Sequence, residues 1–149
     1  MIYSGMMPGE LFILQKDMIH WDKQQIIGCG LKTKKRKETP MVIANYIIPV
    51  LQDLCSLSDK DNLLDMNEHK FYDTFRATIK RLNLRCELVA YSCRHSTGTA
   101  LALQNIAPSV IQKALRHTKF STTEKYIHPD TEDVLGAMNR LNPDEQCQL

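Results

Sequence analysis

Residues 94–130 concentrate side chains that carry chemistry: three histidines, two arginines and one tyrosine. A guanidinium holds oxyanions through its fork of N–H groups, an imidazole moves protons near neutral pH, and a phenol can act as a nucleophile. His117 follows Arg94 by 23 residues, and Tyr126 follows His117 by nine. Each residue alone has an ordinary reading, His117 as a helix cap and Tyr126 as half-buried packing. Their joint spacing needs a further explanation.

A second cluster, "KTKKRK", places five basic residues among six positions at 32–37. By itself such a run is usually a solvated loop. The alternative is a surface that contacts phosphates, whose binding would depend strongly on salt. The net charge is only +2, but the charged residues after 129 are acidic except for Arg140. This asymmetry favours one basic working surface.

The elements that must position these residues are mostly helical. Pro8 is a plausible first residue of a helix, and an S-x-x-E capping box at Ser121 and Glu124 predicts a short helix that presents Tyr126 and His128. Two β-type runs flank the basic cluster, which predicts a small hairpin with a charged connection. The expected class is mostly α with a small β-hairpin or sheet (α+β). Helices are expected over 8–14, 45–57, 68–84, 91–105, 108–117 and 131–141, and strands over 25–32 and 38–44.

Length and composition indicate one domain in a chain of 149 residues. The five cysteines have no regular spacing, which favours reduced thiols over a disulfide framework. The spacing of Cys86, Cys93 and His95 fits no common zinc site, so we expect no metal. Without a signal peptide or an apolar run long enough for a membrane span, a cytoplasmic protein is expected.

The ordered set of motifs resembles the catalytic domain of the tyrosine recombinases, the phage integrase family. "YSCR" resembles the family's H-x-x-R motif, "ALRH" its Leu-Gly-His, and Tyr126 its nucleophile. "GLKTKKRKETPMVI" resembles its β-hairpin, and "YSGMMPGELFILQKDMIHWD" its T-G-x-R-x-x-E-L helix. The resemblance runs from about Tyr3 to His128. It implies a catalytic domain over 1–129, followed by an acidic tail or helix over 130–149.

The resemblance implies DNA cleavage and rejoining through a 3′-phosphotyrosyl intermediate, with Tyr126 as the nucleophile. Arg94 and His117 would hold the non-bridging oxygens, and Lys32 would protonate the leaving 5′-oxygen. Tyr91 stands where the family has its first histidine, and its hydroxyl can still donate. Neither a metal nor another cofactor is implied, because the protein's own cations supply the charge.

The resemblance also implies double-stranded DNA as the partner, with self-association or another recombinase protomer on that DNA. We expect the DNA-contacting residues to be Lys34, Lys35, Arg36, Lys37 and Arg116. Integration or another site-specific recombination is the leading function. A catalytically impaired DNA-binding remnant, or a module that docks on a full-length recombinase, remains an alternative.

Two positions depart from the family pattern. Met7 stands where the family has its first arginine, and a thioether cannot hold a phosphate. Losing one such donor costs on the order of 10²–10³ in rate, by analogy with an oxyanion hole. Arg116 replaces the usual glycine before His117 and is a candidate substitute. The N-terminal helical domain that clamps DNA and the first catalytic-domain helix have no counterpart in the sequence, so an N-terminally truncated domain is expected.

Overall fold

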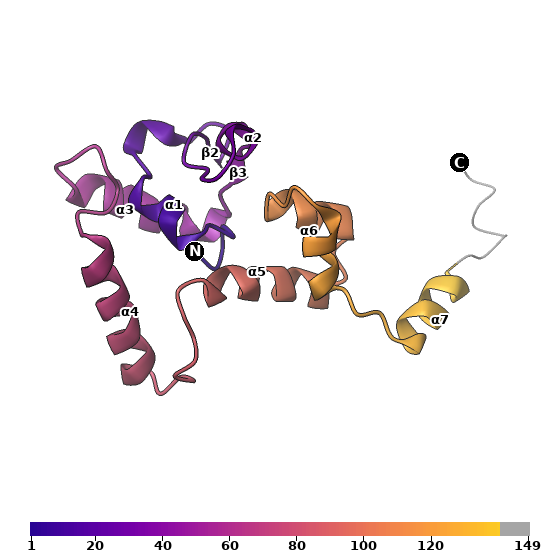
Figure 1. Cartoon of the computed structure of the whole chain (residues 1–149). Coiled ribbons are helices and arrows are strands. Elements are labelled where there is room, and N and C mark those ends of the chain that lie inside the picture. The colour runs from indigo at the N-terminus through magenta and orange to yellow at the C-terminus, as the bar shows by residue number, and fades with distance from the viewer. Residues whose placement is uncertain (141–149) are drawn as a thin grey trace.

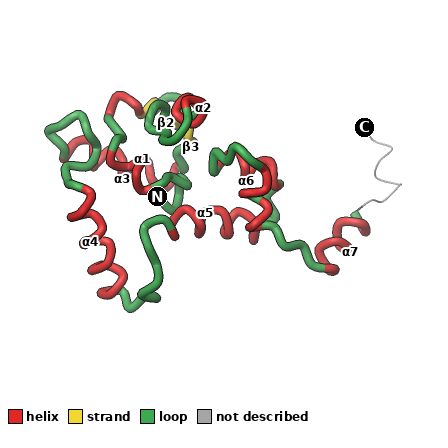
Figure 2. The backbone as a smooth tube through the Cα atoms, in the orientation of Figure 1, coloured by secondary structure: helices red, strands yellow, loops and turns green. Residues whose placement is uncertain are grey.

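The computed structural model describes residues 1–140. Figure 1 shows a helical protein with a very small sheet beside its N-terminal helices, and Figure 2 shows how much of the backbone is loop. This confirms the predicted fold class. The α-helices are α1 (Pro8–Phe12), α2 (Lys34–Glu38), α3 (Ile48–Leu57), α4 (Glu68–Arg81), α5 (Ser92–Leu103), α6 (Pro108–Ala114) and α7 (Thr131–Asn139). Short 3₁₀ turns lie at η1 (Lys16–Met18), η2 (Asn45–Ile47), η3 (Phe120–Thr122) and η4 (Glu124–Tyr126).

The sheet has three antiparallel strands in the order β1–β2–β3: β1 (Ile19–His20), β2 (Gln25–Ile26) and β3 (Met41–Val42). Ile26 pairs with Ile19 on one side and with Met41 on the other. These three side chains are buried, so one face of the sheet belongs to the core. Because each strand is only two residues long, the sheet is stabilised by this packing rather than by the few hydrogen bonds between its strands.

The predicted hairpin exists, but its connection holds a helix that was not expected. α2 begins after Thr33, whose hydroxyl accepts from the backbone N–H of Arg36. Gly28 N–H donates to the carbonyl of Lys37, which fixes the end of this helix against the hairpin. The basic run is therefore a folded element, with exposed lysines at 34, 35 and 37 and a buried arginine at 36.

The main core lies where α1, the sheet and α3 meet. Its fully buried members include Leu14, Ile26, Met41 and Ile43. α4 packs at its edge through Phe71, whose ring meets Phe12 edge-on at 5.2 Å. The helix otherwise points away from the body (Figure 1) and has no buried residue. In the described part of the chain, no helix combines the length and the apolar character needed to cross a membrane.

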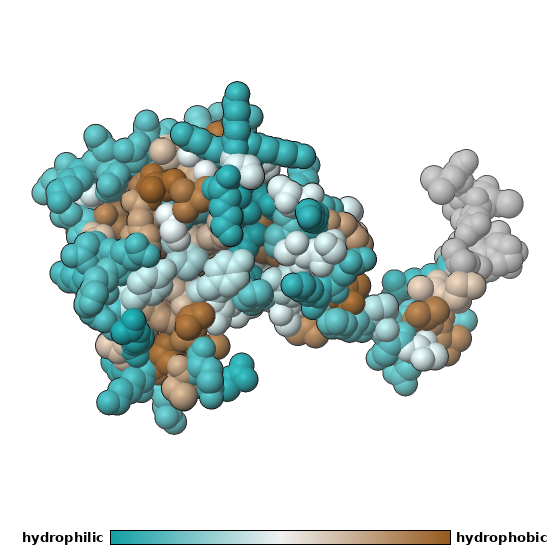
Figure 3. Space-filling view, viewed as in Figure 1, coloured by the Kyte–Doolittle hydropathy of each residue, from teal (hydrophilic) through white to brown (hydrophobic). Residues whose placement is uncertain are grey.

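The C-terminal helices form a second layer beside this core. α5 runs along the molecule and carries α6 at its far end (Figure 1), and Ile111 and Leu115 are fully buried. The helix predicted from Ser121 is two 3₁₀ turns, η3 and η4, and the turn begins after Lys119 instead. α7 stands apart from the body in Figure 3. The helix predicted over 131–141 corresponds to α7, which ends at Asn139, and residue 141 is outside the described residues.

Candidate active site

Arg94 lies at the start of α5 and is only 2% exposed. Its Nη1 donates to the carbonyl of Gly5 and its Nη2 to the carbonyl of Leu115. The guanidinium therefore joins the N-terminal segment to the end of α6. These bonds use two of its five N–H groups, so the planar cation is held in place with donors left over.

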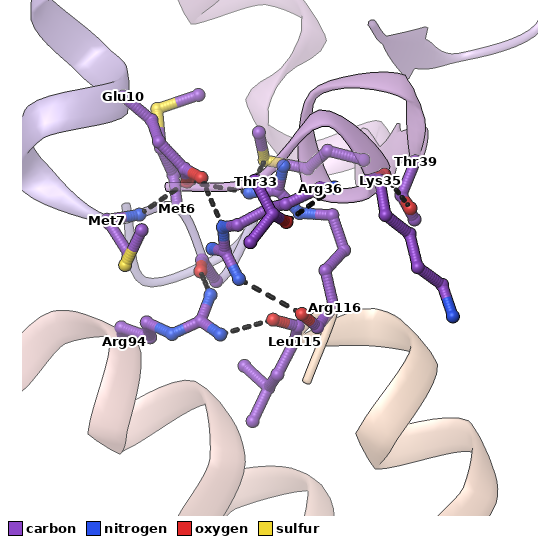
Figure 4. Close-up of polar contacts among 12 residues, drawn as sticks. Met6, Met7, Glu10, Thr33, Lys35, Arg36, Thr39, Arg94, Leu115 and Arg116 are labelled. Carbon is purple, nitrogen blue, oxygen red and sulfur yellow. Dashed lines mark hydrogen bonds and ion pairs between the residues drawn. The ribbon is translucent and has the colours of Figure 1, made fainter. Parts of the chain in front are cut away.

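Glu10 connects Arg94's neighbours into a buried ionic network (Figure 4). Its Oε1 accepts from Arg36 Nε at 2.7 Å, and its Oε2 accepts from Arg116 Nη2 at 2.6 Å and from Met7 N–H at 2.9 Å. Arg36 Nη1 also donates to the carbonyl of Arg116 at 3.0 Å. Burial by itself would raise the pKa of Glu10, but the hydrogen bonds and charges of Arg36, Met7 and Arg116 hold that pKa below its usual value.

The two arginines of this network were predicted to contact DNA. Arg36 is 8% exposed and Arg116 5% exposed, and both guanidiniums are directed at Glu10 rather than at the surface. Arg116 has φ +52°, a left-handed conformation that favours glycine. The side chains of Arg36 and Arg116 are thus both paired with Glu10, and their contact with DNA stays a prediction. Lys34, Lys35 and Lys37 remain exposed along α2.

His117 follows α6 and is held by the turn that comes after it. Its Nδ1 lies 2.9 Å from the hydroxyl of the fully buried Thr123, and its backbone N–H donates to the carbonyl of Gln112. Burial, followed by the positive charges of Arg94 and Arg36, lowers the pKa of His117 to about 4. The imidazole is therefore neutral at pH 7. The Thr123 hydroxyl can donate to Nδ1, and in that tautomer the ring proton of His117 sits on Nε2, from which it can be donated.

Tyr126, the last residue of η4, stacks on His117 with ring centroids 6.2 Å apart and planes 7° apart. Gly98 of α5 makes room for its ring, because a Cβ there would lie 2.7–2.9 Å from three ring carbons. The hydroxyl of Tyr126 lies 2.9 Å from Nδ1 of His95. Burial, the largest influence, raises the pKa of the phenol, while Arg94 opposes this.

Lys32, Met7 and Tyr91 line a separate pocket of about 440 Å³ at the beginning of α1 and α5. Lys32 has φ +77° and an exposed side chain. Tyr91 is 41% exposed, and its ring also meets the ring of His95 edge-on, with centroids 4.9 Å apart. It therefore borders both this pocket and the group formed by His95, His117 and Tyr126. The structure thus brings Arg94, His117 and Tyr126 together and places Lys32 in the neighbouring pocket.

The phage integrase family matches residues 1–133. The chain belongs to the phage integrase family. This family member is 25% identical over 114 residues to a tyrosine recombinase of Thermosipho africanus (strain TCF52B), covering 72% of this chain and 40% of that protein.

Solved structures agree on the fold. The transposon Tn1549 integrase in complex with circular intermediate DNA superposes with a TM-score of 0.79 at 18% identity, over 95% of this chain and 57% of that one. The XerH site-specific recombinase bound to difH substrate superposes with a TM-score of 0.73 at 22% identity, over 92% and 43%. This integrase-family chain therefore spans about half the length of the structures it matches, and 40% of the length of the Thermosipho recombinase.

Three residues of this family member's site were not predicted from its sequence. Thr123 orients His117, Gly98 admits the ring of Tyr126, and His95 meets the Tyr126 hydroxyl. His95 had a usable signal, because it lies four residues after Tyr91 and so shares a helical face with it. His128, whose Nε2 lies 3.0 Å from the carbonyl of Lys125, closes the last turn. Among residues 1–140, no group of three or more His, Cys, Asp or Glu could hold a metal.

Proposed function

We propose that this chain is the catalytic part of a tyrosine recombinase, which cleaves and rejoins double-stranded DNA through Tyr126. One observation carries the proposal: Tyr126, His117 and Arg94 come from η4, the end of α6 and the start of α5, yet they gather at one place. Membership of the phage integrase family supports the same function. In this proposal residues 1–129 form the catalytic domain, and residues 130–149 form an acidic tail that includes α7.

In the proposed reaction, the Tyr126 oxygen attacks the scissile phosphorus and forms a 3′-phosphotyrosyl bond as the bond to the 5′-oxygen breaks. The neutral His117 donates its Nε2 proton as a hydrogen bond to a non-bridging oxygen, and Arg94 offers the N–H groups that its carbonyl partners leave free. Lys32 gives a proton to the leaving 5′-oxygen, and rejoining reverses each step. Tyr91, between the two groups, donates its hydroxyl to the phosphate.

The exposed lysines of α2 are the proposed DNA-contacting residues. Lys34, Lys35 and Lys37 are exposed on the same element whose buried Arg36 anchors it to Glu10. A triple Lys→Gln variant at 34, 35 and 37 should weaken DNA binding and flatten its salt dependence, because each lost phosphate contact removes about 0.9 from the slope. Lys70→Gln, Lys80→Gln and Arg81→Gln together remove three exposed cations from α4 and serve as the matched control.

Self-association through α7 is part of the proposal. α7 begins with a capping box between Asp130 and Asp133, and it exposes Val134, Leu135 and Met138 by 54–60%. A groove of about 490 Å³, whose lining includes the apolar Leu103, Ile106 and Ile111, lies between α5, α6 and the segment 126–133. We propose that α7 of one protomer covers this groove on another protomer on the DNA.

A DNA-binding remnant with impaired chemistry is the second candidate function, and Met7 is the observation that favours it. The Met7 backbone still holds Glu10, but its side chain brings no charge to the pocket that it shares with Lys32. The decisive assay offers a nicked duplex from the DNA flanking the gene, which traps a covalent adduct as a slow band on a denaturing gel. The variants are Tyr126→Phe and Met7→Arg.

An adduct that disappears in Tyr126→Phe supports a recombinase. Restoring the donor with Met7→Arg should raise the cleavage rate by up to about 10²–10³. An adduct seen in Met7→Arg alone would favour the impaired remnant, with position 7 as the cause. The absence of an adduct from every variant, together with salt-sensitive binding, would reject the enzyme and leave a DNA-binding module.

A further inference from the structure

His95 occupies a position that the proposed reaction has not yet used. It lies in the first turn of α5 with its side chain at the surface, next to the buried Arg94. Its Nδ1 is 2.9 Å from Oη of Tyr126. The ring of Tyr91 meets the ring of His95 edge-on, with centroids 4.9 Å apart. The titratable groups that face it are Tyr126 and His117 from the C-terminal segment and Tyr91 from the beginning of α5.

A phenol that attacks phosphorus must give up its proton, and the acceptor must lie within about 2.6–3.2 Å of the phenol oxygen. His95 Nδ1 satisfies this distance. His117 does not serve in the same way, because its Nδ1 is bonded to Thr123 and its ring is stacked parallel to the ring of Tyr126. The two imidazoles are therefore placed differently: the ring of His117 lies parallel to the phenol ring, and His95 meets the phenol oxygen.

Solvent access also favours His95 as the acceptor of the phenol proton. Its exposed ring can release a proton to water and take it back, whereas Arg94 beside it is buried and permanently charged. A neutral His95 with its proton on Nε2 presents a free lone pair at Nδ1 to the Tyr126 hydroxyl.

We propose that His95 is the general base of Tyr126, an inference that rests on the function proposed above. As the bond between Oη and phosphorus forms, the phenol proton passes to His95 Nδ1. The bond from phosphorus to the 5′-oxygen breaks, and that oxygen takes a proton from Lys32. In rejoining, the 5′-hydroxyl attacks, its proton returns to Lys32, and His95 gives its proton back to the departing phenolate.

The first test needs no DNA. Nitrogen-15 spectra of the histidine rings report whether Nδ1 accepts a hydrogen bond, and Tyr126→Phe removes the partner. We expect the Nδ1 resonance of His95 to move in Tyr126→Phe, while the ring resonances of His69, exposed on α4, stay unchanged. Unchanged His95 signals would overturn the proposal whatever the DNA assays show.

The second test measures adduct formation on the nicked duplex between pH 5 and pH 9, in the Met7→Arg background. His95→Gln should lower the rate by about 10²–10⁴ and remove the rise with pH that deprotonation of a base produces. In His95→Ala, added imidazole should restore part of the rate, which a merely structural role would not allow. His69→Gln is the matched control and should leave rate and pH profile unchanged.

The outcomes separate the two proposals. Equal rates and pH profiles with and without His95 would refute the base while leaving the recombinase intact. A missing adduct in the parent and in every variant would refute the proposed function, and the base role with it. The unfolding midpoint of each variant shows whether a lost rate reflects lost folding.

Discussion

His117 should make the stability of the protein depend on pH in a defined direction. Its pKa in the folded protein is about 4, below the 6.5 of a free imidazole, because burial and the charges of Arg94 and Arg36 disfavour its protonation. The unfolded chain therefore takes up the proton first as the pH falls. The free energy of unfolding that His117 contributes is complete above about pH 6.5 and is lost as the pH falls toward 4.

The size of the effect follows from the two pKa values. At about 1.36 kcal/mol per pH unit, the interval from 6.5 to 4 corresponds to a ceiling of ~3.4 kcal/mol. The ring is only partly buried, and solvent screening reduces this to about 1–2 kcal/mol. Between pH 7 and pH 5 we expect the protein to lose roughly 1 kcal/mol through His117 alone.

The assay compares urea unfolding of the native chain and of His117→Asn at pH 7 and pH 5. Asparagine keeps a short polar group near Thr123 but does not titrate. Every other titrating group contributes to both proteins, so the difference between their pH dependences isolates His117. If His117→Asn loses as much stability between pH 7 and pH 5 as the native chain, or more, the assigned burial and charge environment of His117 is wrong. An NMR titration of its ring should find the midpoint near 4.

Two further substitutions test the packing of the site. Glu10→Gln leaves the buried guanidiniums of Arg36 and Arg116 without their carboxylate, and should cost about 3–5 kcal/mol of unfolding free energy; the exposed Glu124→Gln, measured by the same urea titration, should change little. Gly98→Ala places a methyl group against the ring of Tyr126 and should cost about 1–3 kcal/mol. It should also shift the ring resonances of Tyr126 in NMR spectra, and unmoved resonances would contradict the close approach.

The sequence predicted the elements with strong periodicity. The amphipathic pattern from residue 68 corresponds to α4, and Pro108 does begin α6. α2 was missed because a five-residue basic helix is not stable by itself. Its stability comes from the bond between Arg36 and Glu10, 26 residues apart in the chain, which no local pattern reveals.

The same reason explains features of the site that the sequence did not reveal. Arg116 and Arg36 have the composition of a DNA-contacting surface, and only the position of Glu10 in space directs them inward. The short helix predicted from Ser121 gave way to 3₁₀ turns, where Thr123 is fully buried and its hydroxyl meets His117. The contact of His95 with Tyr126 joins residues 31 positions apart, so no local pattern predicts it.

The Glu10 network also constrains how the chain can fold while it is being synthesised. Arg36 and Arg116 are 80 residues apart, and Glu10 and Arg116 are 106 apart. At about 5–20 residues per second, a ribosome needs roughly 4–16 s to extend the chain from the first arginine to the second. During that time Glu10 and Arg36 have emerged without their last partner, and contacts of such long range form late. The nascent N-terminal half therefore cannot complete the site until residue 116 has been synthesised. Synonymous codons that slow translation across residues 36–116 should prolong the exposure of this half to chaperones and proteases.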